Sequence, residues 1–178
     1  MKESEPHKRM AAAMRPTRSL LFYTLAATLP IVILSATLLF TSAGSRTLVA
    51  LSILGCITGL VAFGRLMYET TLDLAGYPEF KLPVWSVFYL IIYLISAFTF
   101  LFFGMHVGSP GRFFGGFEGE PKRAFLDALY LSLTDYIGVT PDSSISTKTQ
   151  GARFLTVGQG IVSMFLNVVI ITKFVSSF

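Results

Sequence analysis

The sequence predicts an all-α membrane protein with four transmembrane helices in each subunit. Of its 178 residues, 53% are hydrophobic and only 13% are charged, and the mean hydropathy is +0.66. Soluble globular domains carry about 25% charged residues, so this composition nearly excludes a soluble enzyme. The 17 Phe and 7 Tyr exclude a disordered chain, because such chains are poor in aromatic residues. Four long apolar stretches complete the prediction.

The four apolar stretches cover residues 20–40, 48–63, 84–103 and about 154–175. A transmembrane helix needs about 20 apolar residues, so each stretch can cross a bilayer or nearly so. Polar residues interrupt the fourth stretch only at Gln159, Asn167 and Lys173. The first two stretches predict an N-terminal hairpin of two transmembrane helices over residues 20–83.

The distribution of basic residues predicts the orientation. Five Lys and Arg residues precede the first stretch, and only Arg46 follows it closely. Because Lys and Arg are enriched on the cytoplasmic side, the tail at residues 1–19 is expected in the cytoplasm. An even number of spans brings the C-terminus back to the same side. We therefore expect an integral protein of the plasma membrane with both ends cytoplasmic.

Several single residues have structural interpretations. Gly55 and Gly59 form a G-x-x-x-G, which we interpret as close packing within one subunit, with a specific helix–helix contact as the alternative. Cys56 is the one cysteine and lies in an apolar run, where inert packing is expected. Trp85 is expected to anchor a helix at the membrane surface. His106 is expected to be a polar tip.

Residues 107–153 separate the third and fourth stretches and are too long for a structureless connection. Residues 108–121 are rich in glycine and typical of turns. Residues 122–134 place apolar side chains at helical spacing, after Pro121, which suits the first position of a helix. These residues make a helix of about 20 Å, too short to span a bilayer. A polar, non-helical stretch is expected at 135–150, and this order predicts a re-entrant hairpin.

Three motifs lie in the second half of the chain. They are F-L-D-A-L-Y-L-S-L-T at 125–134, V-T-P at 139–141 and A-R-F-L-T-V-G-Q-G-I-V at 152–162. They resemble, in this order, the pore-helix motif F-x-D-A-L-Y-F-S-x-x-T, the I-T-P after the filter and the start of the inner helix in the potassium channel superfamily. The resemblance implies a tetrameric pore domain over residues 84–178, built from an outer helix, pore helix, filter loop and inner helix.

The resemblance also implies two sets of site residues. The selectivity filter and ion pathway fall on Thr134, Asp135, Tyr136, Ile137, Gly138 and Val139. The hinge and cavity of the inner helix fall on Gly160, Ser163, Asn167 and Ile171, with Gly160 at the gating hinge. The last four residues share one helical face by their spacing of three and four. For Asn167, an interhelical hydrogen bond is the alternative to a place on the cavity wall.

The filter segment departs from the family's T-V-G-Y-G, because residues 134–141 are T-D-Y-I-G-V-T-P. A stack of inward carbonyls needs backbone angles that glycine adopts readily, and only Gly138 is available. Ile137 is β-branched and resists a positive φ. Four copies of Asp135 would instead form a carboxylate ring, which also selects cations. The alternative is that Asp135 is an N-cap or turn residue bonded to local backbone.

The sequence therefore predicts a homotetrameric cation channel with weak selectivity among monovalent cations such as K⁺ and Na⁺. Two alternatives stay open: a potassium-selective channel with an atypical filter, and a non-conducting subunit that keeps the pore fold for assembly. The expected partners are permeant cations, the lipid bilayer and other copies of the chain, with no nucleic acid. No enzymatic activity, cofactor or metal site is expected, since His7 and His106 are the only histidines in the sequence.

Overall fold

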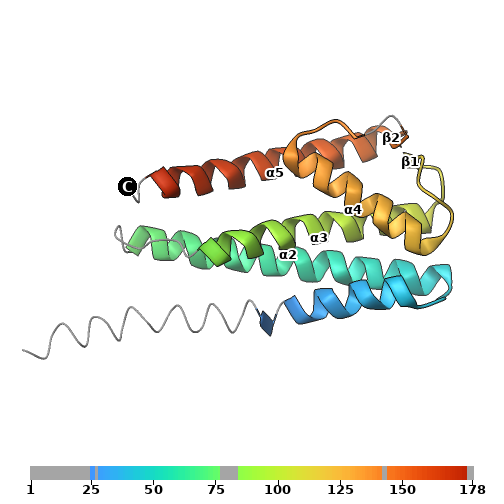
Figure 1. Cartoon of the computed structure of the whole chain (residues 1–178), viewed down its shortest axis with the longest axis horizontal. Coiled ribbons are helices and arrows are strands. Elements are labelled where there is room, and N and C mark those ends of the chain that lie inside the picture. The colour runs from blue at the N-terminus through green and yellow to red at the C-terminus, as the bar shows by residue number, and fades with distance from the viewer. Residues whose placement is uncertain (1–24, 27, 77–83, 142–143, 176–178) are drawn as a thin grey trace, which may run out of the picture.

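The computed structural model describes residues 25–26, 28–76, 84–141 and 144–175. Within these ranges the chain is all-α, with five helices and one pair of very short strands. The elements are a first helix Thr28–Phe40, α2 Ser45–Gly76, α3 Val84–Gly108, β1 Phe114–Gly115, α4 Pro121–Ile137, β2 Ser146–Thr147 and α5 Gln150–Val175. The first helix, α2, α3 and α5 lie lengthwise beside one another, and α4 crosses obliquely between α3 and α5 (Figure 1).

Three helices are apolar enough and long enough to cross a membrane. Their apolar windows are Ser45–Tyr68 in α2, Trp85–Gly108 in α3 and Gln150–Thr172 in α5. These windows mark the chain as an integral membrane protein, as its composition predicted. The predicted first span at 20–40 and the tail at 1–19 lie partly or wholly outside the described residues. Its described helix, Thr28–Phe40, is shorter than a span, so the count of four stays a prediction.

Helix α2 is longer than the apolar stretch that predicted it. The apolar stretch ends at Phe63, but the helix continues to Gly76. The sequence between Gly64 and Gly76 contains neither glycine nor proline, and Pro78 follows just beyond the helix. The charge of Arg65 therefore ends the apolar window without ending the helix, because arginine is a good helix former.

Glycines bring α2 and α3 into close contact. A Cβ atom added at Gly55 would lie 2.5 Å from Cγ of Phe100, and one added at Gly59 would lie 2.8 Å from Cβ of Ala97. Only a residue without a side chain allows the two helices to approach this closely. The G-x-x-x-G thus joins two helices of the same chain, which confirms its interpretation as packing within one subunit.

Aromatic rings fix the start of α4 and the glycine-rich segment against the end of α3. The ring of Phe125 in α4 lies edge-on to Phe103, with centroids 5.5 Å apart, and 5.8 Å from the ring of Phe100. His106 lies 5.0 Å from Phe117 and is only 6% exposed. The prediction of a polar tip at His106 is wrong, because the glycine-rich segment folds back over the imidazole.

Helix α4 begins and ends at residues that suit these positions. Pro121 stands in its first turn. Gly138 ends it in the left-handed conformation, with a φ of 77° and an N–H that donates to the carbonyl of Asp135. The N–H of Val139 donates to the carbonyl of Thr134 over 3.0 Å. The prediction that a non-helical stretch begins at Asp135 is therefore wrong: the helix continues to the first glycine that can end it.

The short strands return the chain after α4 to the segment that precedes it. In this antiparallel pair, Phe114 lies opposite Thr147 and Gly115 opposite Ser146. Gly116 has a φ of 84°, and any Cβ there would collide with the backbone of the returning segment. The path into α4 and the path out of it therefore meet at one end of the bundle, where α3 ends and α5 begins (Figure 1).

Candidate functional site

Hydrogen bonds hold α4 against both neighbouring helices. The Ser132 hydroxyl donates to the carbonyl of Ile95 in α3 over 3.0 Å. In α5, the Gln159 amide nitrogen donates to the carbonyl and hydroxyl oxygens of Ser132, over 2.7 and 2.9 Å. One turn further along α4, the Tyr136 hydroxyl donates to Oδ1 of Asn167 over 2.8 Å. Polar side chains that pair inside an apolar bundle fix the depth of one helix against another.

The two contacts with α5 give the direction and depth of α4. From Ser132 to Tyr136 the chain advances one turn, and their partners Gln159 and Asn167 advance in the same direction along α5. Both helices therefore run inward from the shared end of the bundle. Gln159 is about 13 Å from the start of α5 at 1.5 Å per residue. The last turns of α4 thus lie beside the middle and inner half of the apolar window of α5.

The predicted filter residues fall into two groups. Thr134 is buried, and its hydroxyl donates to the carbonyls of Tyr130 and Leu131 within α4. Because Thr134 and its three successors are helical, their carbonyls do not form an extended row of ion sites. The residues at the end of α4 are exposed in the single chain, namely Ile137, Gly138 and Val139.

Asp135 is not the turn residue that one interpretation expected. It is a helical residue in the last turn of α4, and its Oδ2 atom is buried without a hydrogen-bond partner among the described residues. Burial raises the pKa of Asp135 from 3.8 to about 6 and also raises the pKa of Tyr136. A turn residue would follow the helix, whereas the interpretation as a carboxylate ring stays a prediction.

The predicted hinge and cavity residues of α5 differ in how far they are buried. Ser163 is 1% exposed, Gly160 and Asn167 are half-buried, and Ile171 is 61% exposed. Asn167 accepts the hydroxyl proton of Tyr136, so the alternative of an interhelical hydrogen bond is confirmed for this residue. Ser163 Oγ has no hydrogen-bond partner in the described part of the chain.

Gln159 belongs to the site but is absent from both predicted sets of site residues. Its side chain is fully buried, and its Oε1 atom lacks a partner within the described ranges, whereas its nitrogen binds Ser132. A signal for it existed, since Gln159 is one of three polar interruptions of the fourth apolar stretch. Polar residues inside membrane helices usually mark helix contacts or functional positions.

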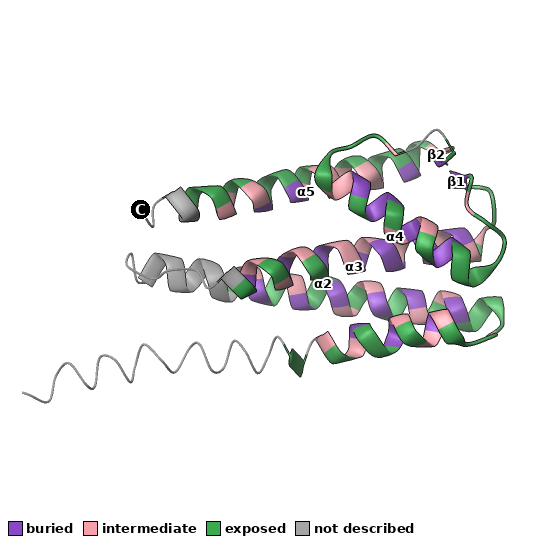
Figure 2. Ribbon diagram, in the orientation of Figure 1, coloured by how far each residue is buried: buried purple, intermediate pink, exposed green. Residues whose placement is uncertain are grey.

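Extended apolar surfaces stay exposed on α4 and α5 (Figure 2). Only 17% of the apolar window of α5 is buried within the chain, compared with 50% of that of α3. The exposed large apolar residues of α5 are Phe154, Val157, Ile161, Met164, Phe165, Val168 and Ile171. Helix α4 exposes a second stripe, made of Leu126, Tyr130, Leu133 and Ile137. Surfaces of this kind are covered by lipid or by other protein chains.

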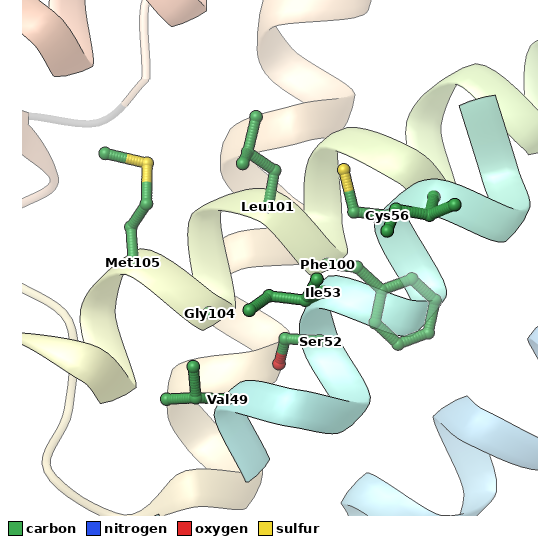
Figure 3. A pocket seen from close by; sticks show the side chains of 9 residues that line it. Val49, Ser52, Ile53, Cys56, Phe100, Leu101, Gly104 and Met105 are labelled. Atoms are coloured by element: carbon green, nitrogen blue, oxygen red, sulfur yellow. The ribbon is translucent and has the colours of Figure 1, made fainter. Parts of the chain in front are cut away.

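A pocket of about 270 Å³ lies between α2 and α3 (Figure 3). Its lining consists of Val49, Ser52, Ile53, Cys56, Ile57, Phe100, Leu101, Gly104 and Met105. The hydroxyl of Ser52 is bonded to the carbonyl of Leu48, and Cys56 is a free, half-buried thiol. Because this lining is almost entirely apolar, the pocket suits a hydrocarbon chain better than it suits a polar substrate. The described residues also contain no group of three or more His, Cys, Asp or Glu that could hold a metal ion.

Hydrogen bonds join Ser132 and Tyr136 of α4 to Gln159 and Asn167 of α5, and this contact is the candidate functional site. It joins one member of each predicted site set, Tyr136 and Asn167, in a helix–helix contact within one chain. Comparisons of the chain with models of known protein families, with curated proteins and with solved structures find no match.

Proposed function

We propose that the chain is the subunit of a homotetrameric cation channel with weak selectivity among monovalent cations. The path of α4 is the observation that carries this proposal. Helix α4 starts at one end of the bundle and ends beside the middle of α5. The chain that follows it then returns to the end of the bundle at which α4 starts. The 17 residues of α4 correspond to about 25 Å, shorter than a span, between two helices that can each cross the membrane. In a bilayer this path is a re-entrant hairpin.

A re-entrant backbone is stable only where it is buried in protein or lines a water-filled cavity. Gly138 and Val139 at the end of α4 are exposed in the single chain, which favours a cavity next to them. The resemblance of residues 84–178 to the potassium channel pore domain leads to the same arrangement. In the proposed tetramer, these two residues of each subunit lie nearest the pathway.

The charge at the end of α4 favours cations. The C-terminal end of a helix carries about half of a negative elementary charge, and α4 directs this end toward the middle of the bundle. Asp135 adds a carboxylate within the last turn. With one of its oxygens buried, Asp135 acts on the pathway through space, from one turn behind the exposed residues.

Several copies of the chain are needed because one hairpin cannot enclose a pore. The exposed apolar stripes of α4 and α5 supply surface for contacts between copies. The number four comes from the sequence resemblance. Weak selectivity is proposed because residues 134–137 are helical, whereas potassium selection in this superfamily uses rings of backbone carbonyls.

The test is to measure ionic current through the purified full chain in planar bilayers. A gradient of KCl should give a reversal potential close to the cation limit, and opposed K⁺ and Na⁺ solutions should give one close to zero. Strong exclusion of Na⁺ would instead support the potassium-selective alternative. Assembled tetramers that carry no current would support the non-conducting subunit.

Cysteine modification tests whether the end of α4 lines the pathway. Val139→Cys, in a Cys56→Ser background, places a thiol on a residue that is 54% exposed. A cationic methanethiosulfonate reagent should reduce its current several-fold. Gly119→Cys is the matched control, because Gly119 is exposed in the glycine-rich segment and has open space around it. Unchanged current after complete modification of Val139→Cys would place the pathway elsewhere.

A further inference from the structure

The pocket between α2 and α3 lies within one half of the membrane. Along α2 it extends from Val49 to Ile57, which lie about 6 and 18 Å from the start of the apolar window at 1.5 Å per residue. The end of α3 lies beside the start of α2, since a Cβ atom added at Gly108 would be 3.6 Å from Cγ2 of Val49. The hydrocarbon core of a bilayer is about 30 Å thick, so the pocket spans the depth of a single leaflet.

The pocket is open at the surface of the single chain. Ser52 and Gly104 hold the two helices close together, because a Cβ atom added at Gly104 would lie 2.8 Å from Cβ of Ser52. Ile53 and Ile57 also line the pocket, and they are 55% and 54% exposed. Figure 3 shows Ile53 on α2 and Met105 on α3 beside this space. The volume of about 270 Å³ is therefore accessible to a molecule that approaches from outside the chain.

The lining restricts the occupant to hydrocarbon. The hydroxyl of Ser52 already donates to the carbonyl of Leu48 over 2.7 Å, and the thiol of Cys56 is a weak donor. The other lining side chains contain neither nitrogen nor oxygen. An extended peptide would lose its hydrogen bonds to water here, at about 1–3 kcal/mol for each polar group left without a partner. Apolar cavities of this kind exclude water and accept apolar molecules, so an acyl chain fits this lining.

A cation lies next to the pocket on the side of the membrane surface. Arg46 is exposed in the first turn of α2, three residues before Val49 and seven before Ile53, and therefore on the same side of the helix. It forms no ion pair with any described residue, and the first turn of α2 contains no acidic residue. A long arginine side chain near the end of a membrane helix extends to the interface, and its guanidinium group binds phosphate well.

We propose that the pocket of each subunit binds one anionic phospholipid, with an acyl chain between α2 and α3 and the phosphate at Arg46. A free phosphate has no part that could fill the apolar pocket, so the ligand is a lipid. An anionic lipid is favoured over a zwitterionic one, because a second headgroup charge of positive sign would be repelled by Arg46. The bound lipid stabilises the contact of α2 with α3. This site lies apart from α4 and α5, so it does not depend on whether the assembled protein conducts.

The first test measures thermal unfolding of the delipidated full chain in detergent. Phosphatidylglycerol, phosphatidylcholine or diacylglycerol with identical acyl chains is added. At saturation, phosphatidylglycerol should raise Tm by on the order of 5 °C, and the two lipids without a net charge should raise it less. Glycerol phosphate, which has the anionic group but no acyl chain, should leave Tm unchanged. An unchanged Tm with phosphatidylglycerol, or equal shifts with all three lipids, would overturn the proposal.

Two variants with matched controls locate the lipid. Ile53→Trp places a larger ring at the mouth of the pocket and should weaken the apparent affinity for phosphatidylglycerol at least about tenfold. Leu54→Trp is its control, because Leu54 is 53% exposed but lies outside the lining.

Arg46→Gln should remove most of the preference for phosphatidylglycerol over phosphatidylcholine. Its control is Arg153→Gln, which changes another exposed arginine near the start of a membrane helix and should keep the preference. Wild-type affinity in Ile53→Trp, or wild-type preference in Arg46→Gln, would overturn the proposed site.

Photolabelling tests the site on the wild-type chain and does not depend on variants that fold. Phosphatidylglycerol with a diazirine group on one acyl chain should label residues 49–57 and 100–105, which mass spectrometry can locate. Val61 is 64% exposed on α2 outside the lining and reports contact with bulk lipid. Excess unlabelled phosphatidylglycerol should reduce labelling of the pocket several-fold more than labelling at Val61. Absence of label in the two segments, or equal competition at Val61, would contradict the proposal.

Discussion

The helix pair α2–α3 and the helix pair α4–α5 are held together by different means. Glycines and large apolar side chains join α2 to α3, and half of the apolar window of α3 is buried. Hydrogen bonds between polar side chains join α4 to α5, and most of α5 stays uncovered. The first pair buries more of its apolar surface within the chain, 33% of the window of α2 and 50% of that of α3, than α5 does at 17%. The second pair contains buried polar groups, and its exposed apolar stripes can contact lipid or other subunits.

The largest effect is expected from a substitution that separates α2 from α3. In Gly59→Leu, the added Cβ meets the side chain and backbone of Ala97, so the helices must move apart. We expect loss of a stable fold or a fall in stability of about 3 kcal/mol or more. Gly64→Leu is the matched control, because the same helix leaves open space at Gly64. Thermal unfolding in detergent measures both, and similar Tm values would show that the glycine contact does not hold the pair.

The next effect concerns assembly through the uncovered face of α5. Ile161 in α5 and Val61 in α2 are 65% and 64% exposed in the single chain. If α5 contacts other subunits while α2 faces lipid, Ile161→Ser should lower the fraction of tetramers and Val61→Ser should not. Native mass spectrometry in mild detergent counts the subunits. Two outcomes would contradict the proposal that α5 contacts other subunits while α2 faces lipid. One is wild-type protein that appears only as monomers or dimers, and the other is an equal loss of tetramers in the two variants.

Local pattern predicted α4 well, but distant contacts could not be predicted. The spacing of Phe125, Leu129 and Leu133 and the position of Pro121 indicated a short helix between two spans, which the structure contains. Its end was placed too early, because the polar side chain of Asp135 resembled the start of a loop. A helix can contain a buried Asp when tertiary contacts stabilise the helix as a whole. Helix α4 ends only before Gly138, which adopts the left-handed conformation that closes a helix.

The partners of α4 in α5 were beyond the reach of sequence spacing. Gln159 bonds to a residue 27 positions earlier, and Asn167 to one 31 positions earlier. No local periodicity fixes the relative depth of two helices separated by a loop. The sequence showed that Gln159 and Asn167 interrupt an apolar stretch, and therefore that α5 needs polar partners. The identity of those partners depends on the position of α4, which the paired strands and the aromatic cluster determine.

A moderate effect is expected from pH. Burial raises the pKa of Asp135 to about 6, so its carboxyl group is neutral near pH 5 and charged near pH 8. Cation preference over anions should therefore fall as pH drops through about 6, and this change should be absent in Asp135→Asn and present in Asp127→Asn. Reversal potentials in KCl gradients measure it. A preference that stays constant down to about pH 5 in the wild type would show that Asp135 does not act on the pathway.

The same titration affects stability with a definite sign. Because the pKa of Asp135 is higher in the folded chain than its usual 3.8, the folded state binds more protons than the unfolded state between these two values. The contribution of Asp135 to stability is therefore complete below about pH 4 and is lost as pH rises through about 6. The difference in Tm between Asp135→Asn and the wild type should therefore grow over this interval.

The smallest effect is expected from one hydrogen bond between α4 and α5. Tyr136→Phe removes the 2.8 Å bond to Asn167 and keeps the aromatic ring, so stability should fall by about 0.5–1.5 kcal/mol. Tyr130→Phe makes the same change on the exposed stripe of α4, where 43% exposure leaves room for lipid or another subunit, and should change stability less. Combining Tyr136→Phe with Asn167→Ala in a double-mutant cycle isolates the pair. A coupling energy near zero would mean that this bond does not hold α4. A coupling of about 1 kcal/mol would be much smaller than the loss expected for Gly59→Leu. It would show that several weak polar contacts hold α4, whereas steric fit holds α2 to α3.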